Sequence, residues 1–302
     1  MAKTILSYPD EPYIYMYVMG RWYCYDPSSK PLGKGAMGTV YMGYRVEDAK
    51  PVAVKRVVDE YADIAMIRTR AKQEASLAFR HPNLIEMIGY CEYEPDRGPL
   101  FLLSNYVKGM NIDDFLNKQR EDLRFTLACE AICKILDALE YIHSRGVIHR
   151  DIKPSNIMME NGGNVRLMDL GIARMNDSGT KAGFIGTLQY AAPEQLLRGK
   201  GSQVQINATT DIYALGVTFY ELLTGTNPYD VGSDMEIWNR QLTEMLPHDS
   251  RIPKKLMRVI WKATEKQQAS RFQKAADFKA ALNAALQPRH TWLSKITAYI
   301  NS

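Results

Sequence analysis

The sequence is poor in the features that mark secreted, disulfide-rich or membrane-spanning proteins. It has only 4 cysteines in 302 residues, too few and too scattered for a disulfide framework, so we expect reduced thiols in a cytosol. The longest apolar run near the N-terminus, Tyr13 to Gly20, is eight residues, far below the roughly 18 that cross a bilayer. We therefore expect a cytoplasmic protein with neither a secretion signal nor a transmembrane segment.

A strong charge of one sign is also missing. The net charge is +4, and up to Ser104 the 13 basic residues match 13 acidic ones, against 25 and 21 in the remainder. Nucleic-acid-binding domains carry a larger basic excess, so we expect no nucleic-acid partner. The apolar share of 46% and the 20 glycines are close to globular averages, and a chain of this length can bury a large core.

The periodicity of apolar residues changes along the chain from strands to helices. The stretch 38–44 alternates and 51–58 is β-branched, with a polar hairpin connection between them, while 63–79 has helical spacing. A connection is expected within 99–109. Beyond it the spacing predicts helices over 123–144, 211–224, 235–245, 254–266 and 275–286. The fold class is therefore α+β, with a small sheet lobe followed by a larger helical lobe.

The first 27 residues are unusually aromatic. We expect them to pack on the small lobe as an extra strand or strap, because aromatic residues favour strands; docking of a partner is the alternative. The aromatic residues are Tyr8, Tyr13, Tyr15, Tyr17, Trp22, Tyr23 and Tyr25.

Three glycines, Gly33, Gly35 and Gly38, are spaced so that a tight turn between strands can bring backbone N–H groups onto phosphate oxygens. A merely permissive hairpin is the alternative. Seventeen residues after Gly38, Lys55 lies on an apolar strand, where a buried ammonium needs an anion. A phosphate under the glycine turn and the carboxylate of Glu74 in the following helix would supply it; a lysine that reaches solvent is the other interpretation.

A cluster of charge and amide lies between two apolar runs in 147–159. There Asp151 could accept a hydroxyl proton, Lys153 could neutralise a transferring phosphoryl group, and Asn156 offers an oxygen to Mg²⁺. Thirteen residues after Asn156, Asp169 follows a predicted strand and offers a second hard oxygen ligand. Each of these residues has a structural explanation alone, but the ordered set favours phosphoryl transfer.

With these motifs, the segment 28–286 resembles the protein kinase superfamily, in which each motif has a known role in phosphoryl transfer. The resemblance implies a bilobal fold with an antiparallel sheet and one main helix in an N-lobe over 28–104. It implies a helical C-lobe over 105–286, a hinge at 104–109 and an activation segment at 169–194, leaving extensions at 1–27 and 287–302. The sequence of the catalytic loop, 149–156, is especially similar to that of bacterial eukaryotic-like serine/threonine kinases.

The resemblance also assigns the nucleotide site. ATP is the implied cofactor, with Mg²⁺, or alternatively Mn²⁺, held by Asn156 and Asp169. Lys55 would hold the α- and β-phosphates and Glu74 would pair with it. The other implied nucleotide contacts come from the glycine turn, the adenine pocket and the ribose position: Leu32, Gly33, Gly35, Gly38, Val40, Ala53, Ser104, Asn105, Val107, Asn111 and Met158.

For catalysis the resemblance implies that Asp151 is the base, Lys153 contacts the γ-phosphate and Thr187 orients both. As structural supports, Glu194 would pair with Arg271, and Asp211 would anchor the catalytic-loop backbone. Lys153 and the segment 186–194 resemble serine/threonine rather than tyrosine kinases. A protein serine/threonine kinase acting on protein hydroxyls is thus the main hypothesis; a pseudokinase scaffold is the alternative, and a small-molecule phosphotransferase is disfavoured by that segment.

Three departures from the family pattern qualify this assignment. Glu74 precedes the His81-Pro-Asn motif by seven residues instead of about nine, so its helix must be shorter or its end remodelled. Leu170 replaces the usual phenylalanine after Asp169, and the small Ser104 predicts an open rear pocket. The polar run 175–181 contains Ser178 and Thr180, whose autophosphorylation would create a partner for Arg150; an unmodified loop is the alternative.

Overall fold

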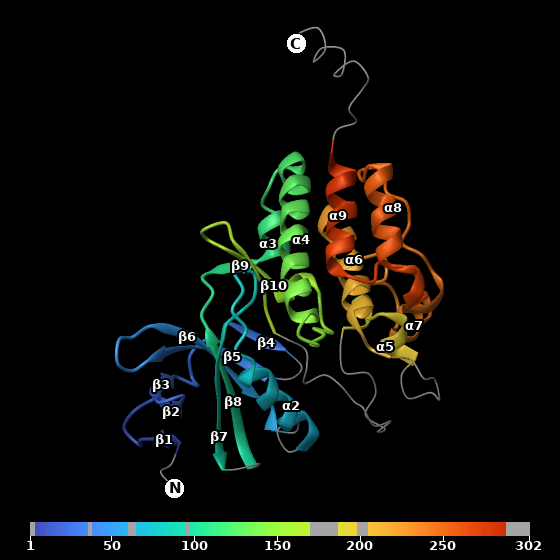
Figure 1. The fold of residues 1–302 in the computed structure, drawn as a ribbon. Coiled ribbons are helices and arrows are strands. Elements are labelled where there is room, and N and C mark those ends of the chain that lie inside the picture. The colour runs from blue at the N-terminus through green and yellow to red at the C-terminus, as the bar shows by residue number, and fades with distance from the viewer. Residues whose placement is uncertain are drawn as a thin grey trace.

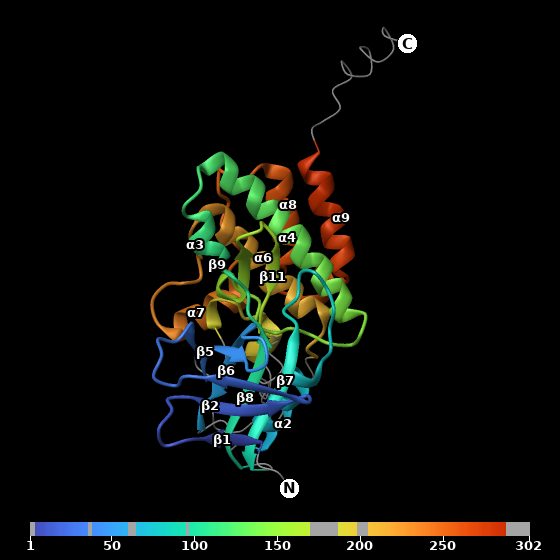
Figure 2. The ribbon, with the colours of Figure 1, turned by 90° about the vertical axis from the view of Figure 1, so that its left-hand side faces the viewer.

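The computed structural model describes residues 4–35, 38–59, 65–94, 97–169, 187–197 and 205–287. Figure 1 shows a strand-rich lobe formed by the first part of the chain and a helical lobe formed by the second, and Figure 2 shows the same division from the side. The predicted small sheet lobe and larger helical lobe are therefore confirmed.

Eight strands form the sheet of the first lobe, in the order β1-β2-β3-β5-β6-β8-β7, with β4 paired to one end of β5. Its printed pairings are all antiparallel. The strands are β1 (Ile5–Ser7), β2 (Ile14–Val18), β3 (Arg21–Tyr25), β4 (Gly33–Gly35), β5 (Gly38–Arg45), β6 (Pro51–Val57), β7 (Met87–Glu94) and β8 (Arg97–Asn105).

The aromatic N-terminal residues contribute three strands of this sheet, where the sequence predicted one strand or a strap. β3 continues the sheet beside β5, and the chain before it returns to β7, where the Thr4 hydroxyl donates to the Glu92 carbonyl at 3.0 Å. Tyr25 is fully buried and lies 5.8 Å from the ring of Phe101. In contrast, Tyr8 is 51% exposed, so only part of the aromatic set packs in the core.

Helix α2 (Ala65–Ser76) covers the sheet with a face of small residues. Ala71 and Ala75 pack on Val57, Leu100 and Leu102 in a cluster of their own. The short side chains let the helix lie close to the strands. Glu74, three residues after Ala71, lies on the same face of the helix and is therefore held near the sheet. The helix ends at Ser76, short of the predicted end at residue 79. The Leu77 N–H donates to the Glu74 carbonyl and the Phe79 N–H to the Leu77 carbonyl, so the helical i to i−4 pattern is not continued.

Between the lobes, β8 continues to Asn105, well past the start of the connection predicted at 99–109, because it pairs with both β6 and β7. A second sheet then begins with β9 (Gly109–Asn111), which pairs with β10 (Ile157–Glu160), itself paired with β11 (Val165–Leu167). Gly109 is needed here, because a Cβ at this position would lie 2.0 Å from the Met159 carbonyl oxygen.

The helices of the second lobe lie within a few residues of their predicted ranges where the sequence predicted them. The core helix α6 is buried along nearly its whole length, begins at a capping box of Asn207 and ends at Gly225, whose φ is 78°. None of the described helices is both long and apolar enough to span a membrane. The helices are α3 (Ile112–Leu116), α4 (Glu121–His143), α5 (Pro193–Leu197), α6 (Ala208–Thr224), α7 (Asp234–Thr243), α8 (Lys254–Ala263) and α9 (Ala275–Leu286).

Candidate active site

A cavity of about 420 Å³ is lined by residues of both lobes. Most of the residues predicted from sequence for nucleotide and metal line it. Four predicted site residues do not: Glu74, Asn105, Asp151 and Thr187. The lining residues are Leu32, Gly33, Lys34, Gly35, Gly38, Val40, Ala53, Lys55, Ser104, Tyr106, Val107, Gly109, Asn111, Lys153, Ser155, Asn156, Met158, Met168 and Asp169.

The glycine turn on the sheet side is held by strand pairing. β4 and β5 are in register with Gly33 opposite Val40 and Gly35 opposite Gly38. Gly33 and Gly35 are exposed, and a Cβ at either would have no atom within 4 Å. At Gly38 a Cβ would lie 2.3 Å from the Arg56 carbonyl oxygen, so only glycine fits without a backbone shift. The three glycines therefore serve different local needs.

Lys55 lies in the middle of β6, opposite Val40 on β5, and its side chain enters the cavity. Its Nζ is 3.2 Å from Oδ2 of Asp169, which comes from the other lobe. This contact joins two predicted ligand-binding residues across the cavity. Glu74 lies on α2 and is only 4% exposed, so its carboxylate is buried beside the sheet; its pairing with Lys55 stays a prediction.

The inner wall of the cavity follows the end of β8. Ser104 is in register with Ala53 on β6, and both line the cavity. The backbone N–H of Asn105 donates to the Glu86 carbonyl at 2.9 Å. The backbone contact to the nucleotide that is predicted for Asn105 would therefore be made by its carbonyl oxygen. Val107 lies farther along the wall and is 7% exposed.

The catalytic loop has a strained backbone that a buried carboxylate holds in place. Arg150 has a φ of 71°, a region that L-residues rarely adopt. The N–H groups of His149 and Arg150 donate to Oδ2 and Oδ1 of Asp211 at 2.8 and 2.7 Å, and His143 contacts Oδ2 at 2.7 Å. The predicted anchoring of this loop by Asp211 is confirmed.

Two ionisable groups have shifted pKa values, His149 of this loop and Asp211 of α6. Burial lowers the pKa of His149, so its ring stays neutral. Its Nε2 lies 2.9 Å from the Met168 carbonyl oxygen, and its Nδ1 accepts from the Asp151 N–H at 3.3 Å. Burial alone would raise the pKa of Asp211, but the hydrogen bond from His143 and the nearby imidazole and backbone donors bring it below the usual value. Asp211 is thus a buried anion that accepts hydrogen bonds from two backbone N–H groups of the loop and from His143.

The polar side chains after Arg150 are in mutual contact. Asn156 Nδ2 donates to Oδ2 of Asp151 at 2.5 Å and to its carbonyl oxygen at 2.7 Å. Lys153 Nζ donates to Thr187 Oγ1 at 2.7 Å and is 3.7 Å from Asp151 Oδ2. The structure therefore brings these four residues together beside the cavity, although only Lys153 and Asn156 line it. Their catalytic roles stay predictions.

The donors suit a hard divalent cation. Asn156 and Asp169 both line the cavity, and because Asn156 Nδ2 faces Asp151, its amide oxygen lies on the other side of the group. No group of three or more His, Cys, Asp or Glu residues suited to a metal occurs in the described part of the chain. Mg²⁺ commonly uses one or two protein oxygens and takes the remainder from phosphate and water, so the two residues fit it.

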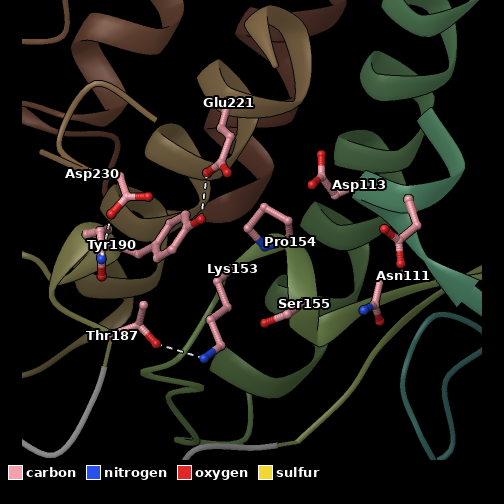
Figure 3. Close-up of a pocket in the computed structure, with 11 residues that line it drawn as sticks. Asn111, Asp113, Lys153, Pro154, Ser155, Thr187, Tyr190, Glu221 and Asp230 are labelled. Atoms are coloured by element: carbon pink, nitrogen blue, oxygen red, sulfur yellow. Dashed lines mark hydrogen bonds between the residues drawn. The ribbon is translucent and has the colours of Figure 1, made fainter. Parts of the chain in front are cut away.

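A second hollow of about 320 Å³ lies next to Lys153 and Thr187 (Figure 3). Its lining includes carboxylates from α3, α6 and the segment after α6. Burial raises the pKa of one of them, Glu221, which accepts a hydrogen bond from the Tyr190 hydroxyl at 2.6 Å. The lining residues are Asn111, Asp113, Asp114, Lys153, Pro154, Ser155, Thr187, Gln189, Tyr190, Glu221 and Asp230.

A buried ion pair supports the segment that follows Thr187. Arg271 Nη1 and Nη2 donate to Oε1 and Oε2 of Glu194 at 2.7 and 2.8 Å, with both side chains almost fully buried. The pair predicted from sequence is confirmed, in the bidentate geometry that arginine allows. Leu170, Ser178 and Thr180 lie outside the described residues.

Comparison with known proteins agrees with this geometry. The family profile described as "Protein kinase domain" matches residues 27–286. The chain belongs to the protein kinase family. The predicted family and fold are therefore confirmed. Among solved structures, the kinase domain of Mycobacterium tuberculosis PknI superposes with a TM-score of 0.64 at 22% identity, covering 94% of this chain and 99% of that one, which supports the fold.

Two bacterial serine/threonine-protein kinases are among the curated relatives of this kinase-family chain. The chain is 34% identical over 277 residues to "Serine/threonine-protein kinase pkn3" of Myxococcus xanthus. The matched region covers 85% of this chain and 49% of that protein. The chain is also 34% identical over 263 residues to "Serine/threonine-protein kinase PknB" of Mycobacterium tuberculosis, covering 83% of this chain and 41% of that protein. The chain thus spans half or less of the length of these relatives.

Sequence reasoning missed several residues of this kinase site. Tyr106 and Met168 line the cavity, although neither lies in a phosphate or metal motif. His143 belongs to none of the motifs, yet it contacts Asp211, 68 residues away. Proximity to the hinge and to Asp169 could have indicated Tyr106 and Met168, but no local signal indicates His143.

Proposed function

We propose that the chain is a serine/threonine protein kinase that transfers the γ-phosphoryl group of ATP to hydroxyl groups of proteins, including its own. The observation that carries the proposal is the cavity in which Lys55 of one lobe meets Asp169 of the other, with Asn156 beside them. A cation, a carboxylate and an amide oxygen at one end of a cavity suit a metal-bound triphosphate. The names of the bacterial relatives support the same activity.

The nucleotide is proposed to lie with its base between the apolar walls of the cavity. Leu32, Val40, Ala53 and Met158 would enclose the adenine, whose edge would meet the Asn105 carbonyl and the Val107 N–H. Asn111 would contact the ribose. Ser104 would leave space behind the adenine, and Gly33, Gly35 and Gly38 would cover the phosphates with backbone N–H groups. All but Asn105 line the cavity, which supports the assignment.

For phosphoryl transfer, the residues around the loop have separate roles. Asp151 would orient the substrate hydroxyl and take up its proton, while Lys153 would bind the γ-phosphate. Thr187 would orient Lys153, which it contacts at 2.7 Å. Lys55, paired with Glu74, would hold the α- and β-phosphates.

Asn156 and Asp169 are proposed to hold Mg²⁺, with Mn²⁺ as the alternative ion. When bound, the metal would neutralise charge on the phosphates. The chain's own contribution is to fix the two oxygen ligands: Asn156 by its bonds to Asp151, and Asp169 by its contact with Lys55. We place the protein in the cytosol, which the four free cysteine thiols support.

A comparison of two variants tests the activity. With radiolabelled ATP, Mg²⁺ and a mixed-histone preparation, Asp151→Asn should transfer phosphate at least ~100-fold more slowly than wild type, because the base is lost. Lys55→Met should lose transfer as well. Binding of Mg·ATP should be retained in Asp151→Asn and weakened in Lys55→Met, since of these two residues only Lys55 is proposed to contact the nucleotide.

The outcomes separate this proposal from a pseudokinase scaffold. A wild-type chain that binds Mg·ATP without transferring phosphate to histones or to itself would favour the scaffold. Equal turnover by wild type and Asp151→Asn would contradict the role given to Asp151. As a matched control, Asp137→Asn removes an exposed carboxylate that pairs with Lys279 on the far helices and should leave transfer unchanged.

A further inference from the structure

Gln241 is a polar residue of α7 that is completely buried. Its Nε2 donates to the carbonyl oxygen of Gln189 at 2.6 Å and to that of Leu188 at 3.2 Å. Both carbonyls belong to the short helix η3 (Leu188–Tyr190), which directly follows Thr187. Burying an amide costs free energy unless its hydrogen bonds are made, so these contacts fix the position of η3 relative to α7.

The amide of Gln241 has only one orientation that satisfies its neighbours. Lys266 Nζ donates to the Tyr213 hydroxyl at 2.8 Å, so Tyr213 must send its own proton elsewhere. That proton goes to Gln241 Oε1 at 2.6 Å, which leaves the NH₂ group of Gln241 facing η3. Lys266 also donates to the Gln241 main-chain carbonyl at 2.8 Å and to the Tyr229 hydroxyl at 3.1 Å, which fixes the backbone there.

η3 forms one wall of the hollow beside Lys153. Gln189 and Tyr190 line that hollow together with Thr187, whose hydroxyl accepts from Lys153 (Figure 3). Gln189 Nε2 donates in turn to Asp230 at 2.9 Å. Lys153 also lies 3.7 Å from Asp151, so a protein segment that brings its hydroxyl to Asp151 would lie next to this wall. Gln241 does not line the nucleotide cavity.

We propose that Gln241 is a positioning residue for the protein substrate. Gln241 is held by Tyr213 and Lys266, and its hydrogen bonds to η3 fix η3 in place. The hollow therefore keeps the shape that a substrate segment fits. The inference rests on the proposed kinase function and adds to it a determinant of substrate binding on α7. The effect is separate from nucleotide binding because Gln241 contacts η3 and not the cavity walls.

Gln241→Met tests this, because methionine keeps the length and volume of glutamine while removing both donors and the acceptor. With the mixed-histone preparation as substrate, we expect KM for histone to rise about tenfold, because the two hydrogen bonds that hold η3 and the one that Tyr213 donates are all lost. KM for ATP should stay within twofold. Tyr213→Phe, which removes only the hydroxyl that orients the amide, should raise KM for histone by a smaller factor.

Ile237→Ala is the matched control, because Ile237 is a buried residue of the same helix whose apolar side chain forms no hydrogen bond to η3. It should lower the thermal stability at least as much as Gln241→Met, yet leave KM for histone near the wild-type value. If both variants raise this KM equally, the effect is general destabilisation and the proposal fails.

Hydrogen–deuterium exchange gives a readout that does not depend on activity. In Gln241→Met the amides of Tyr190 and Ala191, which donate to the Thr187 and Leu188 carbonyls, should exchange at least several-fold faster than in wild type or Ile237→Ala. Unchanged exchange there would overturn the positioning role even in an active kinase. Faster exchange in a chain without kinase activity would instead contradict the proposed function and keep the structural role of Gln241.

Discussion

The two walls of the nucleotide cavity are built in different ways. On the sheet side, Gly33 and Gly35 are exposed, and neither has an atom within 4 Å of where a Cβ would lie. On the helical side, the loop that carries Asp151 is held by Asp211, which is completely buried and accepts two backbone N–H groups. One wall is thus open backbone held by strand pairing, and the other is backbone held by a buried anion.

This difference indicates in which wall the free energy of unfolding and the binding of ligand depend on the same residues. A change in the exposed part of the glycine turn removes no packing, so its effect should appear in nucleotide affinity alone. A change in the buried polar groups of the helical lobe leaves donors without acceptors, so it should alter the free energy of unfolding and the catalytic loop together.

Asp211→Asn should have the largest effect. Asparagine offers one acceptor oxygen where the carboxylate offers two, so a buried N–H of His149 or Arg150 loses its partner while Arg150 must still keep its φ of 71°. We expect the free energy of unfolding in urea to fall by about 3 kcal/mol. Phosphate transfer by the remaining folded protein should fall as well.

Asp137→Asn gives the matched comparison for that change. The Asp137–Lys279 pair joins α4 and α9 at 2.6 Å, but its side chains are 46% and 33% exposed, and exposed ion pairs contribute little. Its free energy of unfolding should change by less than about 1 kcal/mol. An equal loss in both variants would mean that the burial of Asp211 is not what matters.

Within the sheet wall, Gly38→Ala and Gly35→Ala should differ. The added methyl at Gly38 would lie 2.3 Å from the Arg56 carbonyl oxygen and must displace backbone, which typically costs about 1–3 kcal/mol. At Gly35 the methyl meets open space, so thermal denaturation should show no more than about 0.5 kcal/mol of change. A loss of Mg·ATP affinity in Gly35→Ala without loss of stability would show that the turn contacts the nucleotide directly.

A pH dependence is also expected in the helical lobe. Burial, with nearby Arg271, lowers the pKa of Lys266 to about 7, while Glu244 and Glu265 oppose the shift. Tyr213 and Tyr229, which face Lys266, have pKa values raised by burial and stay protonated in this range. The unfolded chain therefore binds more protons than the folded chain between pH 7 and about 10, so stability should rise with pH across this window.

Lys266→Met should flatten that dependence. The difference in free energy of unfolding between wild type and Lys266→Met should change steadily from pH 7 to about pH 9 in favour of wild type. Urea denaturation at several pH values measures it. A constant difference over this range would show that Lys266 titrates at the ordinary value of an exposed lysine.

Much of the fold could be predicted from sequence because its signals are local. Helix α9 has the bounds that its apolar spacing predicted, and β5 and β6 pair across the polar connection as expected. The number of N-terminal strands was underestimated, because a run rich in tyrosine predicts strand but not where its hydrogen-bond partners lie. The end of α2 and the start of the connection between the lobes were also misjudged. β8 continues to Asn105 because it pairs with two neighbouring strands, which the local sequence does not show.

The division into two lobes and most of the predicted residues that line the cavity follow from the sequence alone. Periodicity and motif spacing act between near neighbours, and Lys55, Asn156 and Asp169 can be read from them. Which buried polar groups hold these residues in place depends on the tertiary structure. Gln241 meets η3 across 52 residues and His143 meets Asp211 across 68, and such contacts depend on how whole helices pack.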